Sequence, residues 1–431
     1  MDLQFLGGAR EVGRSAILVN DSLLLDYGML AGTPPRFPVA DPDPDAVVVS
    51  HGHLDHAGAV PALLSGESRP PIHWTPPTRE LAVTLAEDTL KLHGGTLRCP
   101  FTENDLRRVR GASEAHGYRE PFSAAGHEVT FYNAGHIPGS AHVLVDDGDT
   151  RLLYTGDFHT ADHRGSDAPA SRTDRLGDPI RGQRLVSGTT ARPTADVVLC
   201  ESTYSDVDHD PRSEVEERFA RSVEETLWEG GTVVVPAFAI GRTQEMLLVC
   251  EAHDIPCYVD GMGKRVTRML RQYPEFVRDA DALRRATSHA RFVTGRNGQR
   301  KRITDQRAAI VTTSGMLSGG PAMTYIPEIR SNPTNKITLT GYQVQGTPGR
   351  SLVETGSAEI DGRVMPVAAR VEQYDFSAHA DREGLRSFLD AYPDAEVVVN
   401  HGDRCVDFAA ELDADGFAAT APEVGETVTV E

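Results

Sequence analysis

The sequence of 431 residues lacks the features of membrane and secreted proteins. No apolar run approaches the roughly 18 residues that a membrane-spanning helix needs. The first residues, Met1-Asp2-Leu3-Gln4-Phe5, have neither the basic start nor the apolar core of a signal peptide. The five cysteines are scattered and form no C-x-x-C pair, which argues against a disulfide framework and a cysteine-based zinc site. We therefore expect a cytoplasmic protein with reduced thiols and no membrane partner.

Lysine is also nearly absent from the sequence. Only four of the 43 basic residues are lysine, whereas Asp and Glu together number 63, and the net charge is −20. This composition resembles that of proteins from salt-loving organisms, whose surfaces are acidic whatever they bind. An acidic excess is unusual for a protein that binds polyanions. Charges are strongly screened at high salt, however, so the overall charge does not decide the substrate.

Apolar strand-like segments alternate with helical ones, which predicts an α/β fold. A helix is expected at residues 77–92, where Leu81, Leu85 and Leu92 recur at helical spacing. Residues 160–195 are rich in Asp, Arg, Gly, Ser and Pro and predict a long exposed loop. The expected strands of the first half lie at 16–19, 23–26, 46–50, 128–132, 142–145, 151–154 and 197–200.

The pattern changes after Glu201. A helix (213–229), a strand (232–236), a helix (243–253) and a strand (257–260) follow in order, as in a separate parallel α/β unit. We therefore predict that an inserted α/β domain occupies residues 206–345. The segments 1–205 and 346–431 would then form the N-terminal and C-terminal parts of the other domain.

Four potential metal ligands occur within six residues, in His51-Gly52-His53-Leu54-Asp55-His56. They directly follow the apolar segment 46–50, so a turn after a buried strand can point them inward together. Imidazole and carboxylate groups are natural zinc ligands. Two single residues, His136 and Asp157, also follow predicted strands, at the strand ends where α/β sites are built. The sequence thus predicts a metal centre.

This ligand pattern resembles that of the metallo-β-lactamase superfamily. The resemblance implies an αββα sandwich with a site for two Zn²⁺ ions along one edge. One zinc would be held by His51, His53 and His136, and the other by Asp55 and His56, with Asp157 bridging both. Asp26, at the end of an early strand, would orient a ligand without binding metal. His73, His142 and His159 are left out, because the other positions already fill two sites.

Three further motifs resemble motifs A, B and C of the β-CASP nucleases. They are Leu199-Cys200-Glu201-Ser202-Thr203-Tyr204, Phe376-Ser377-Ala378-His379-Ala380-Asp381 and Val397-Val398-Val399-Asn400-His401-Gly402-Asp403. A histidine in motif C is typical of the RNA-cleaving members, so His401 points to RNA and would complete the second zinc site. Motif B is closer to the cleavage-and-polyadenylation branch than to ribonuclease J. The chain resembles the short archaeal members of that branch, which lack a KH module. Its composition suggests that it comes from a salt-loving archaeon.

The resemblance implies hydrolysis of single-stranded RNA to products with a 5′-phosphate and a 3′-hydroxyl. Two metal ions about 3.5–4 Å apart would activate a water and clamp the phosphate. His379 would be the general acid, and Glu201 would accept its hydrogen bond and keep it protonated. Asp381 would orient the same loop or cap a helix.

Candidate RNA contacts lie in the inserted segment. Arg242 stands where a strand gives way to a helix, and the turn Ser314-Gly315 follows an apolar strand, so both are candidate phosphate contacts. A dense basic stretch is either a phosphate track or a solvated face. Its members are Arg284, Arg285, Arg291, Arg296, Arg300, Lys301 and Arg302.

Three alternatives to an endonuclease remain at this point. The first is a 5′-to-3′ exoribonuclease of the ribonuclease J type. It would differ from an endonuclease in having a pocket for the 5′ end that closes the RNA-binding groove between the two domains. The second is a non-catalytic RNA-processing scaffold, against which the complete ligand set argues. The third is a small-molecule hydrolase of the same fold, against which the inserted domain argues. The resemblance also suggests a homodimer.

Overall fold

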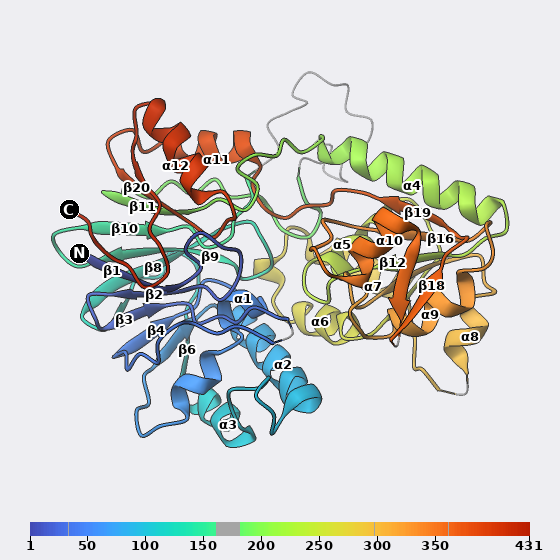
Figure 1. Ribbon diagram of the computed structural model, residues 1–431, viewed down its shortest axis with the longest axis horizontal. Helices are drawn as coiled ribbons and strands as arrows, with labels where there is room; N and C mark the ends of the chain where they lie inside the picture. Colours follow the sequence, from blue (N-terminus) through green and yellow to red (C-terminus); the bar gives the residue numbers. More distant parts are fainter. Residues whose placement is uncertain (33, 161–181, 297, 361) are drawn as a thin grey trace. The chain divides into compact units, whose positions relative to one another are not determined.

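The computed structural model describes residues 1–32, 34–160, 182–296, 298–360 and 362–431 (Figure 1). Two compact units emerge from the contacts between residues. Among the described residues, the first unit contains 1–160, 188–208 and 378–431, and the second contains 182–187 and 209–377. No helix in these ranges combines the length and apolarity needed to cross a membrane. Most of the predicted loop 160–195 lies outside the described residues.

The first unit contains two seven-stranded sheets. One has the order β22-β1-β2-β3-β4-β5-β6, antiparallel from β22 to β3 and parallel from β3 to β6. Its strands are β1 (Asp2–Gly7), β2 (Ala16–Val19), β3 (Leu23–Leu25), β4 (Ala46–Val48), β5 (Ile72–Trp74), β6 (Ser113–Ala115) and β22 (Thr427–Thr429). The parallel half matters for function, because parallel strands bring their carboxyl ends to one edge.

The other sheet has the order β21-β20-β11-β10-β9-β8-β7. It is parallel from β21 to β10 and antiparallel from β10 to β7. Its strands are β7 (Phe122–Ala124), β8 (His127–Asn133), β9 (Ala141–Asp146), β10 (Arg151–Tyr154), β11 (Val197–Glu201), β20 (Glu396–Asn400) and β21 (Ala418–Thr420).

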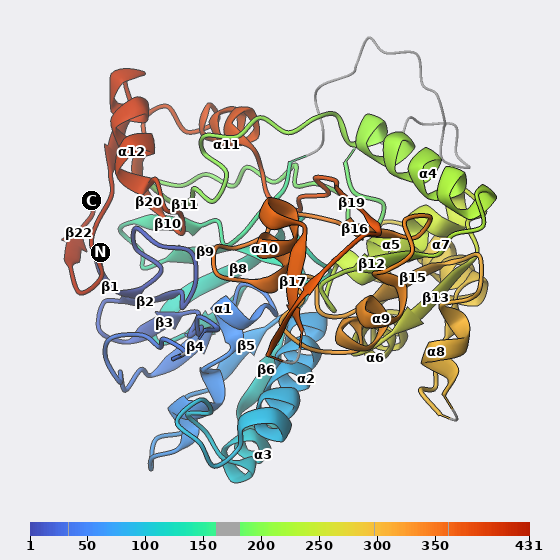
Figure 2. The ribbon, with the colours of Figure 1, turned by 45° about the vertical axis from the view of Figure 1, so that its right-hand side comes forward.

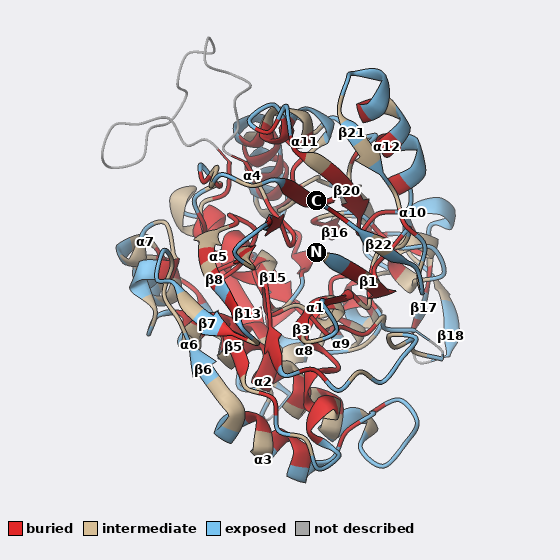
Figure 3. Cartoon of the chain, turned by 90° about the vertical axis from the view of Figure 1, so that its left-hand side faces the viewer, coloured by how far each residue is buried: buried red, intermediate tan, exposed pale blue. Residues whose placement is uncertain are grey.

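Three apolar clusters make this unit a four-layer αββα stack. The central cluster contains side chains from both sheets, among them Phe5, Phe131 and Val143, and therefore lies between them. A second cluster joins the outer face of the first sheet to α1 (Leu54–Ala57), the 3₁₀ helix η1 (Val60–Leu64), α2 (Pro76–His93) and α3 (Glu103–Ala112). A third joins the other sheet to α11 (Arg382–Leu389) and α12 (Cys405–Ala414) (Figures 1 and 3).

Local sequence explains where the outer helices begin. Thr75 accepts a hydrogen bond from the Thr78 amide, and Pro76 fills the first helical position of α2, where no amide donor is required. Thr102 and Asp105 form a reciprocal capping box at the start of α3. Asp381 accepts from the Gly384 amide and caps α11, which is one of the two roles expected for it.

The second unit is built on a six-stranded, all-parallel sheet with the order β14-β13-β15-β12-β16-β19 (Figure 2). Its strands are β12 (Val233–Pro236), β13 (Cys257–Asp260), β14 (Arg291–Phe292), β15 (Ala309–Thr312), β16 (Lys336–Leu339) and β19 (Arg370–Gln373). The strands β17 (Ser357–Ile360) and β18 (Arg363–Pro366) pair separately. The inner strands are buried along their whole length, as expected for a sheet covered on both faces.

Helices cover both faces of this parallel sheet. One apolar cluster joins it to α8 (Gln299–Ile303), α9 (Ala322–Ile329) and α10 (Pro348–Thr355). The helices α4 (Arg212–Trp228) and α5 (Arg242–Ala252) contact its strands but add no residue to this cluster, so they cover the opposite face. The remaining helices are α6 (Gly263–Leu270), the 3₁₀ helix η2 (Pro274–Phe276) and α7 (Ala280–His289).

The predicted α/β class is confirmed, and the elements expected at 77–92 and between 213 and 260 are found within one or two residues of their predicted ends. The extent of the second unit differs from the prediction. Lys336 of β16 pairs with Arg370 of β19, which places residues 370–373 in the parallel sheet. The second unit therefore continues to Ser377 rather than ending near residue 345.

Candidate metal centre

Parallel strands of the first sheet position one half of the predicted ligands. The amide of Asp26, directly after β3, donates to the carbonyl of Val48 at the end of β4. The chain continues from β4 to His51 and then to His53, which occupies the N-cap position of α1. The short helix α1 itself carries Asp55 and His56. The compact motif thus reaches inward because a strand, a turn and one helical turn follow each other within about ten residues.

The other half comes from the second sheet. Asp157 follows β10, Glu201 ends β11 and His401 follows β20, and these three neighbouring strands are parallel. Their carboxyl ends therefore meet at one edge of the sheet. His136 follows β8 of the same sheet. Residues that are more than 240 positions apart in sequence reach one place in this way.

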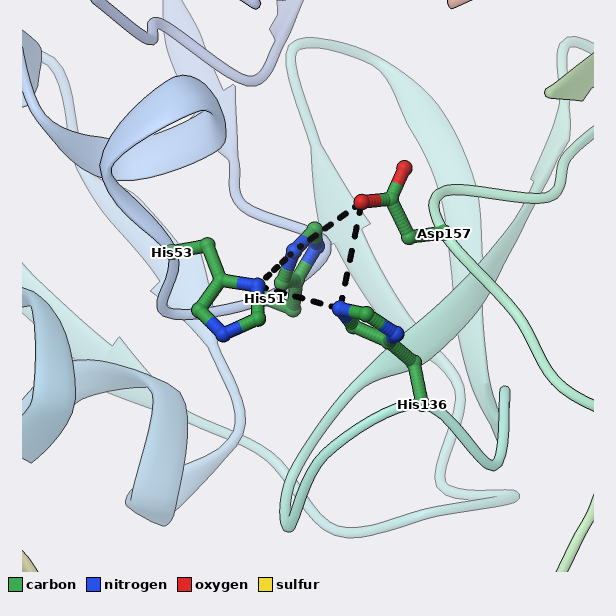
Figure 4. A group of neighbouring side chains, drawn as sticks. All are labelled: His51, His53, His136 and Asp157. Atoms are coloured by element: carbon green, nitrogen blue, oxygen red, sulfur yellow. Dashed lines mark hydrogen bonds and ion pairs between the residues drawn. The ribbon is translucent and has the colours of Figure 1, made fainter. Parts of the chain in front are cut away.

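One group of ligands comprises His51, His53, His136 and Asp157 (Figure 4). One ligand atom from each residue lies within 4.8 Å of all the others. Nδ1 of His53 is 3.2 Å from Nε2 of His51 and 3.0 Å from Nε2 of His136. The Oδ2 atom of Asp157 lies 3.5 Å from Nε2 of His51 and 3.9 Å from Nε2 of His136. These atoms converge as ligands around a single ion do.

A second group comprises Asp55, His56, Asp157 and His401, again with ligand atoms within 4.8 Å of one another. In this group the ligand atom of Asp157 is its other carboxylate oxygen, Oδ1. Its Oδ1 atom lies 3.3 Å from Nε2 of His56 and 3.2 Å from Nδ1 of His401. Nε2 of His401 lies 3.6 Å from Oδ2 of Asp55. Asp157 therefore belongs to both groups, with one carboxylate oxygen in each.

Buried ligand atoms without partners show that these residues fit a metal. Nε2 of His56, Oδ1 of Asp157 and Nε2 of His401 are buried, and none has a hydrogen-bond partner among the described residues. A buried polar atom without a partner costs about 1–3 kcal/mol. Imidazole nitrogens and carboxylate oxygens are a zinc-type donor set, so a bound cation would satisfy all three atoms. We conclude that this is a metal-binding site.

The charge states of His51, His136 and Asp157 already suit metal binding, whereas those of His56 and His401 do not. Burial lowers the pKa values of His56 and His401, but the charge of Asp157 outweighs burial and raises them, so a bound cation would have to displace their protons. Burial, together with the neighbouring imidazoles, holds the pKa values of His51 and His136 well below the ordinary value, so both rings are neutral at pH 7. Burial disfavours the charged form of Asp157, but the imidazoles of His401 and His56 outweigh this effect and hold its pKa well below the usual range. Neutral imidazoles and an ionised carboxylate are the forms that bind metal.

Asp26 orients His56 from behind. Its Oδ2 atom accepts from Nδ1 of His56 at 2.7 Å, so the Nε2 lone pair points toward the metal site. The same carboxylate accepts from the amide and hydroxyl of Ser50 and from the hydroxyl of Tyr154, each at 2.7 Å. Both Asp26 and His401 have a positive φ, which is uncommon for residues other than glycine and occurs at functional sites. Sequence reasoning included Asp26 but missed Ser50 and Tyr154, which no local motif marks.

His379 and Glu201 form a pair beside the shared ligand. Nδ1 of His379 lies 3.0 Å from Oε2 and 3.2 Å from Oε1 of Glu201. One ligand-type atom from each of them and one from Asp157 lie within 4.8 Å of one another. Burial lowers the pKa of His379, but the charge and the hydrogen bond of Glu201 outweigh burial and raise that pKa to about 9. The imidazole is therefore protonated near neutral pH.

The preceding residue anchors this pair to the metal ligands. The carbonyl of Ala378 accepts from Nδ1 of His136 at 2.8 Å, which turns Nε2 of His136 toward the first ligand group. The rings of His136 and His379 lie 4.5 Å apart between centroids. The predicted ligand His136 is thus hydrogen-bonded to the residue that directly precedes the predicted acid, His379.

The predicted RNA contacts belong to the second unit, not to the unit that carries the metal ligands. Arg242 is the first residue of α5, and its guanidinium donates to the carbonyl of Thr340. The Gly315 carbonyl accepts from the side chain of Gln343 at 3.4 Å. Ser314 accepts from the Ser318 amide at 2.9 Å. Their role toward RNA stays a prediction.

The basic stretch of the second unit is largely neutralised by its own surroundings. Four of its seven members form ion pairs, which argues against a phosphate track built from the whole stretch. The pairs are Arg284–Asp281, Arg285–Glu251, Arg300–Asp260 and Lys301–Glu328.

Three family models match consecutive parts of the chain. The metallo-beta-lactamase superfamily matches residues 10–200, the Beta-Casp domain matches 243–352, and the Zn-dependent metallo-hydrolase RNA specificity domain matches 364–422. The chain belongs to the β-CASP family of the metallo-β-lactamase superfamily. The family predicted from motifs A to C is therefore confirmed, and the β-CASP match lies within the second unit.

Archaeal relatives support the same branch of the β-CASP family. "RNase aCSPSF2" of Saccharolobus solfataricus is 36% identical over 411 residues, covering 93% of this chain and 79% of the relative. "Probable RNase MJ4" of Methanocaldococcus jannaschii is 30% identical and covers both chains completely. "Transcription termination factor FttA" of the same organism is 32% identical over 94% of this chain and 68% of its own length. A salt-loving origin stays a prediction.

A solved structure shares the fold. It is titled as a protein of unknown function from Enterococcus faecalis V583, with a TM-score of 0.58, 12% identity, and coverage of 100% of this chain and 99% of that one. At this identity the likeness concerns the fold alone.

Gly28 is a further site residue that sequence reasoning missed. A Cβ atom at this position would lie 1.7 Å from the carbonyl oxygen of Asp55 and 2.8 Å from the amide nitrogen of His56. We expect Gly28→Ala to displace both ligands and to lower zinc affinity on the order of 10–100-fold. Calorimetric zinc titration measures this. Gly66→Ala is the control, because nothing lies within 4 Å of its Cβ; wild-type affinity in Gly28→Ala would contradict the packing argument.

Asp26→Asn tests the orienting role of that carboxylate. The substitution removes the charge that keeps the proton on Nδ1 of His56. We expect zinc affinity to fall on the order of 10–100-fold while the protein stays folded. Competition with a chromophoric chelator measures the affinity, and circular dichroism reports the fold. Asp21→Asn changes an exposed carboxylate nearby and leaves the affinity unchanged; an equal loss in both variants would refute a specific role for Asp26.

Proposed function

We propose that this chain is a zinc-dependent ribonuclease that cleaves single-stranded RNA internally, in RNA 3′-end processing or decay. The observation that carries the proposal is the position of Asp157, which places one carboxylate oxygen in each ligand group beside the His379–Glu201 pair. A bridging carboxylate with an adjacent acid suits in-line attack on a phosphodiester. The relatives named as RNases favour RNA as the substrate.

Each ligand group would hold one zinc ion. His51, His53 and His136 would hold the first, Asp55, His56 and His401 the second, and Asp157 both. The chemistry that zinc supplies when bound is Lewis acidity, which activates an attacking water and polarises a phosphate near neutral pH.

The residues of the chain supply orientation and a proton. Asp26 keeps the proton of His56 on Nδ1, and the Ala378 carbonyl does the same for His136, so each ring offers Nε2 to the metal. Because Nδ1 of His379 donates to Glu201, we assign the proton on Nε2 to the leaving 3′-oxygen. The products would carry a 5′-phosphate and a 3′-hydroxyl.

A 5′-to-3′ exonuclease would use the same chemistry. One relative, 33% identical over 93% of this chain, is named "RNase J-like protein". Endonucleolytic and exonucleolytic cleavage differ in how the RNA reaches the site. An endonuclease lets the RNA chain pass through the site, whereas a 5′-to-3′ exonuclease admits the RNA only by its 5′ end. A cytoplasmic location and a homodimer remain further predictions from the family resemblance.

Cleavage of 5′-labelled single-stranded RNA tests the ribonuclease. We expect wild type with zinc at high salt to give internal fragments, and His379→Ala to cleave 10²- to 10⁴-fold more slowly, as is typical of a lost general acid. His93→Ala, at the end of α2, is the histidine control and keeps full activity.

Other outcomes of this assay separate the alternatives. Release of labelled mononucleotide alone would replace the endonuclease with the exonuclease. Full activity of His379→Ala would remove its assignment as the acid. No cleavage by zinc-loaded wild type would overturn the ribonuclease and leave the scaffold and the small-molecule hydrolase.

The pH dependence tests the role of Glu201. His379 donates a proton only while it is protonated, so activity is present below its pKa and is lost as pH rises through it. Glu201 raises this pKa, and Glu201→Gln therefore moves the alkaline loss of kcat/KM to lower pH, by about one unit or more. Glu383→Gln, an exposed carboxylate on α11, leaves the profile unchanged. An unshifted alkaline limb in Glu201→Gln with normal zinc content would disprove the coupling.

A further inference from the structure

A second constellation of metal-binding side chains lies away from the metal centre, on β5 and β6 at the edge of the first sheet. His73 is the middle residue of β5, and it pairs directly with Glu114, the middle residue of β6. His116 follows β6, and its amide donates to the carbonyl of Trp74 at 3.0 Å. Figure 2 shows β5 and β6 side by side. None of these residues belongs to the two ligand groups that share Asp157.

Their donor atoms converge. Nδ1 of His73 lies 3.0 Å from Nε2 of His116 and 3.7 Å from Oε2 of Glu114. One ligand atom from each of the three residues lies within 4.8 Å of the other two. Two ligands at about 2.0–2.2 Å from a tetrahedral ion are roughly 3.3–3.6 Å apart, so these separations require only small movements on binding.

Aromatic packing fixes both imidazole rings. Phe122 stacks on His116 with a centroid distance of 3.7 Å and an interplanar angle of 8°, and on His73 at 5.0 Å and 22°. The carbonyl of His73 accepts from the amide of Val49, so β5 is also held to the segment that leads into His51. Ring orientations that are set before binding favour metal affinity.

The charge states are also those of ligands. Burial lowers the pKa of His73 to about 4, although the charge of Glu114 opposes this effect. Burial likewise lowers the pKa of His116. Both rings are therefore neutral at pH 7, which is the form that binds a metal. His73 is buried with a side-chain exposure of 3%, whereas Glu114 is 56% exposed, so the site is reached from solvent on the Glu114 side.

We propose that His73, Glu114 and His116 bind an additional zinc ion, separate from the metal centre. Two imidazoles and one carboxylate are a zinc-type donor set, with a fourth position open to water, whereas calcium and magnesium prefer oxygen ligands throughout. Bound there, the ion would tie the three-residue edge strand β6 to β5. Because α3 leads directly into β6, the ion also secures the end of that helix. This assignment does not depend on the proposed ribonuclease activity.

Zinc stoichiometry of the full chain tests the proposal. Protein stripped by a chelator is reloaded with zinc and desalted, and the bound zinc is measured by mass spectrometry. We expect wild type to hold one equivalent more than His116→Ala, and Glu114→Gln to lose the same equivalent at a lower chelator concentration than wild type. Glu128→Gln, an exposed carboxylate on β8, is the matched control and retains the wild-type ratio. Equal zinc content in wild type and His116→Ala would overturn the proposal and leave a hydrogen-bonded histidine pair.

Cobalt substitution gives a second readout that does not rely on counting. A tetrahedral cobalt ion absorbs in the visible range, so the difference spectrum between wild type and Glu114→Gln reports this site alone. We expect an absorption band that both Glu114→Gln and His116→Ala lack and that Asp26→Asn retains. Glu114 is exposed, so its substitution leaves the fold intact even where His116→Ala does not. Identical spectra of wild type and Glu114→Gln would refute coordination by this carboxylate.

Discussion

The burial of a single carboxylate, that of Asp157, constrains the rest of the metal-bearing unit. Its side chain is only 2% exposed, and an ionised group at such depth is costly unless opposite charges or hydrogen-bond donors surround it. Here four imidazoles, those of His51, His56, His136 and His401, lie within 4 Å of its two oxygens. In their metal-binding forms His56 and His136 turn Nε2 lone pairs toward it and not N–H groups, so a bound cation would supply the charge that this carboxylate requires. The αββα stack brings the rings of both sheets together around it.

The two sheets contribute in complementary ways. The first sheet supplies a compact run of ligands after β4, whereas the second supplies single residues after β8, β10 and β20. The central apolar cluster packs the two sheets against each other and so fixes the spacing between the two sets of ligands. Packing energy far from the site therefore maintains distances of 3–4 Å inside it, because a close-packed core transmits displacement rather than absorbing it.

The sequence indicated the candidate ligands that the structure brings together, but not the groups that hold them. His51, His53, Asp55 and His56 are adjacent in sequence, and strand–turn–helix geometry brings such residues together locally. The groups behind them depend on contacts between strands that are distant in sequence: Tyr154 reaches Asp26 across 128 residues. Gly28 illustrates the same limit. Only a glycine fits at this position because the carbonyl of Asp55 lies where a Cβ atom would be, and this contact is visible only in the folded structure. The extent of the second unit was likewise set by the pairing of β16 with β19, which no local pattern encodes.

Glu201 contacts both the loop of Asp157 and the ring of His379 through one side chain. Its Oε1 atom accepts from the amide of Phe158, the residue next to Asp157, at 2.7 Å. Its carboxylate also engages Nδ1 of His379, and Thr203 donates to Oε2 at 2.6 Å. The peptide that follows Asp157 and the ring of His379 are therefore held by the same group. A carboxylate at this position sets both the place and the protonation of the His379 ring, because its geometry is fixed by the loop and its charge acts on the ring.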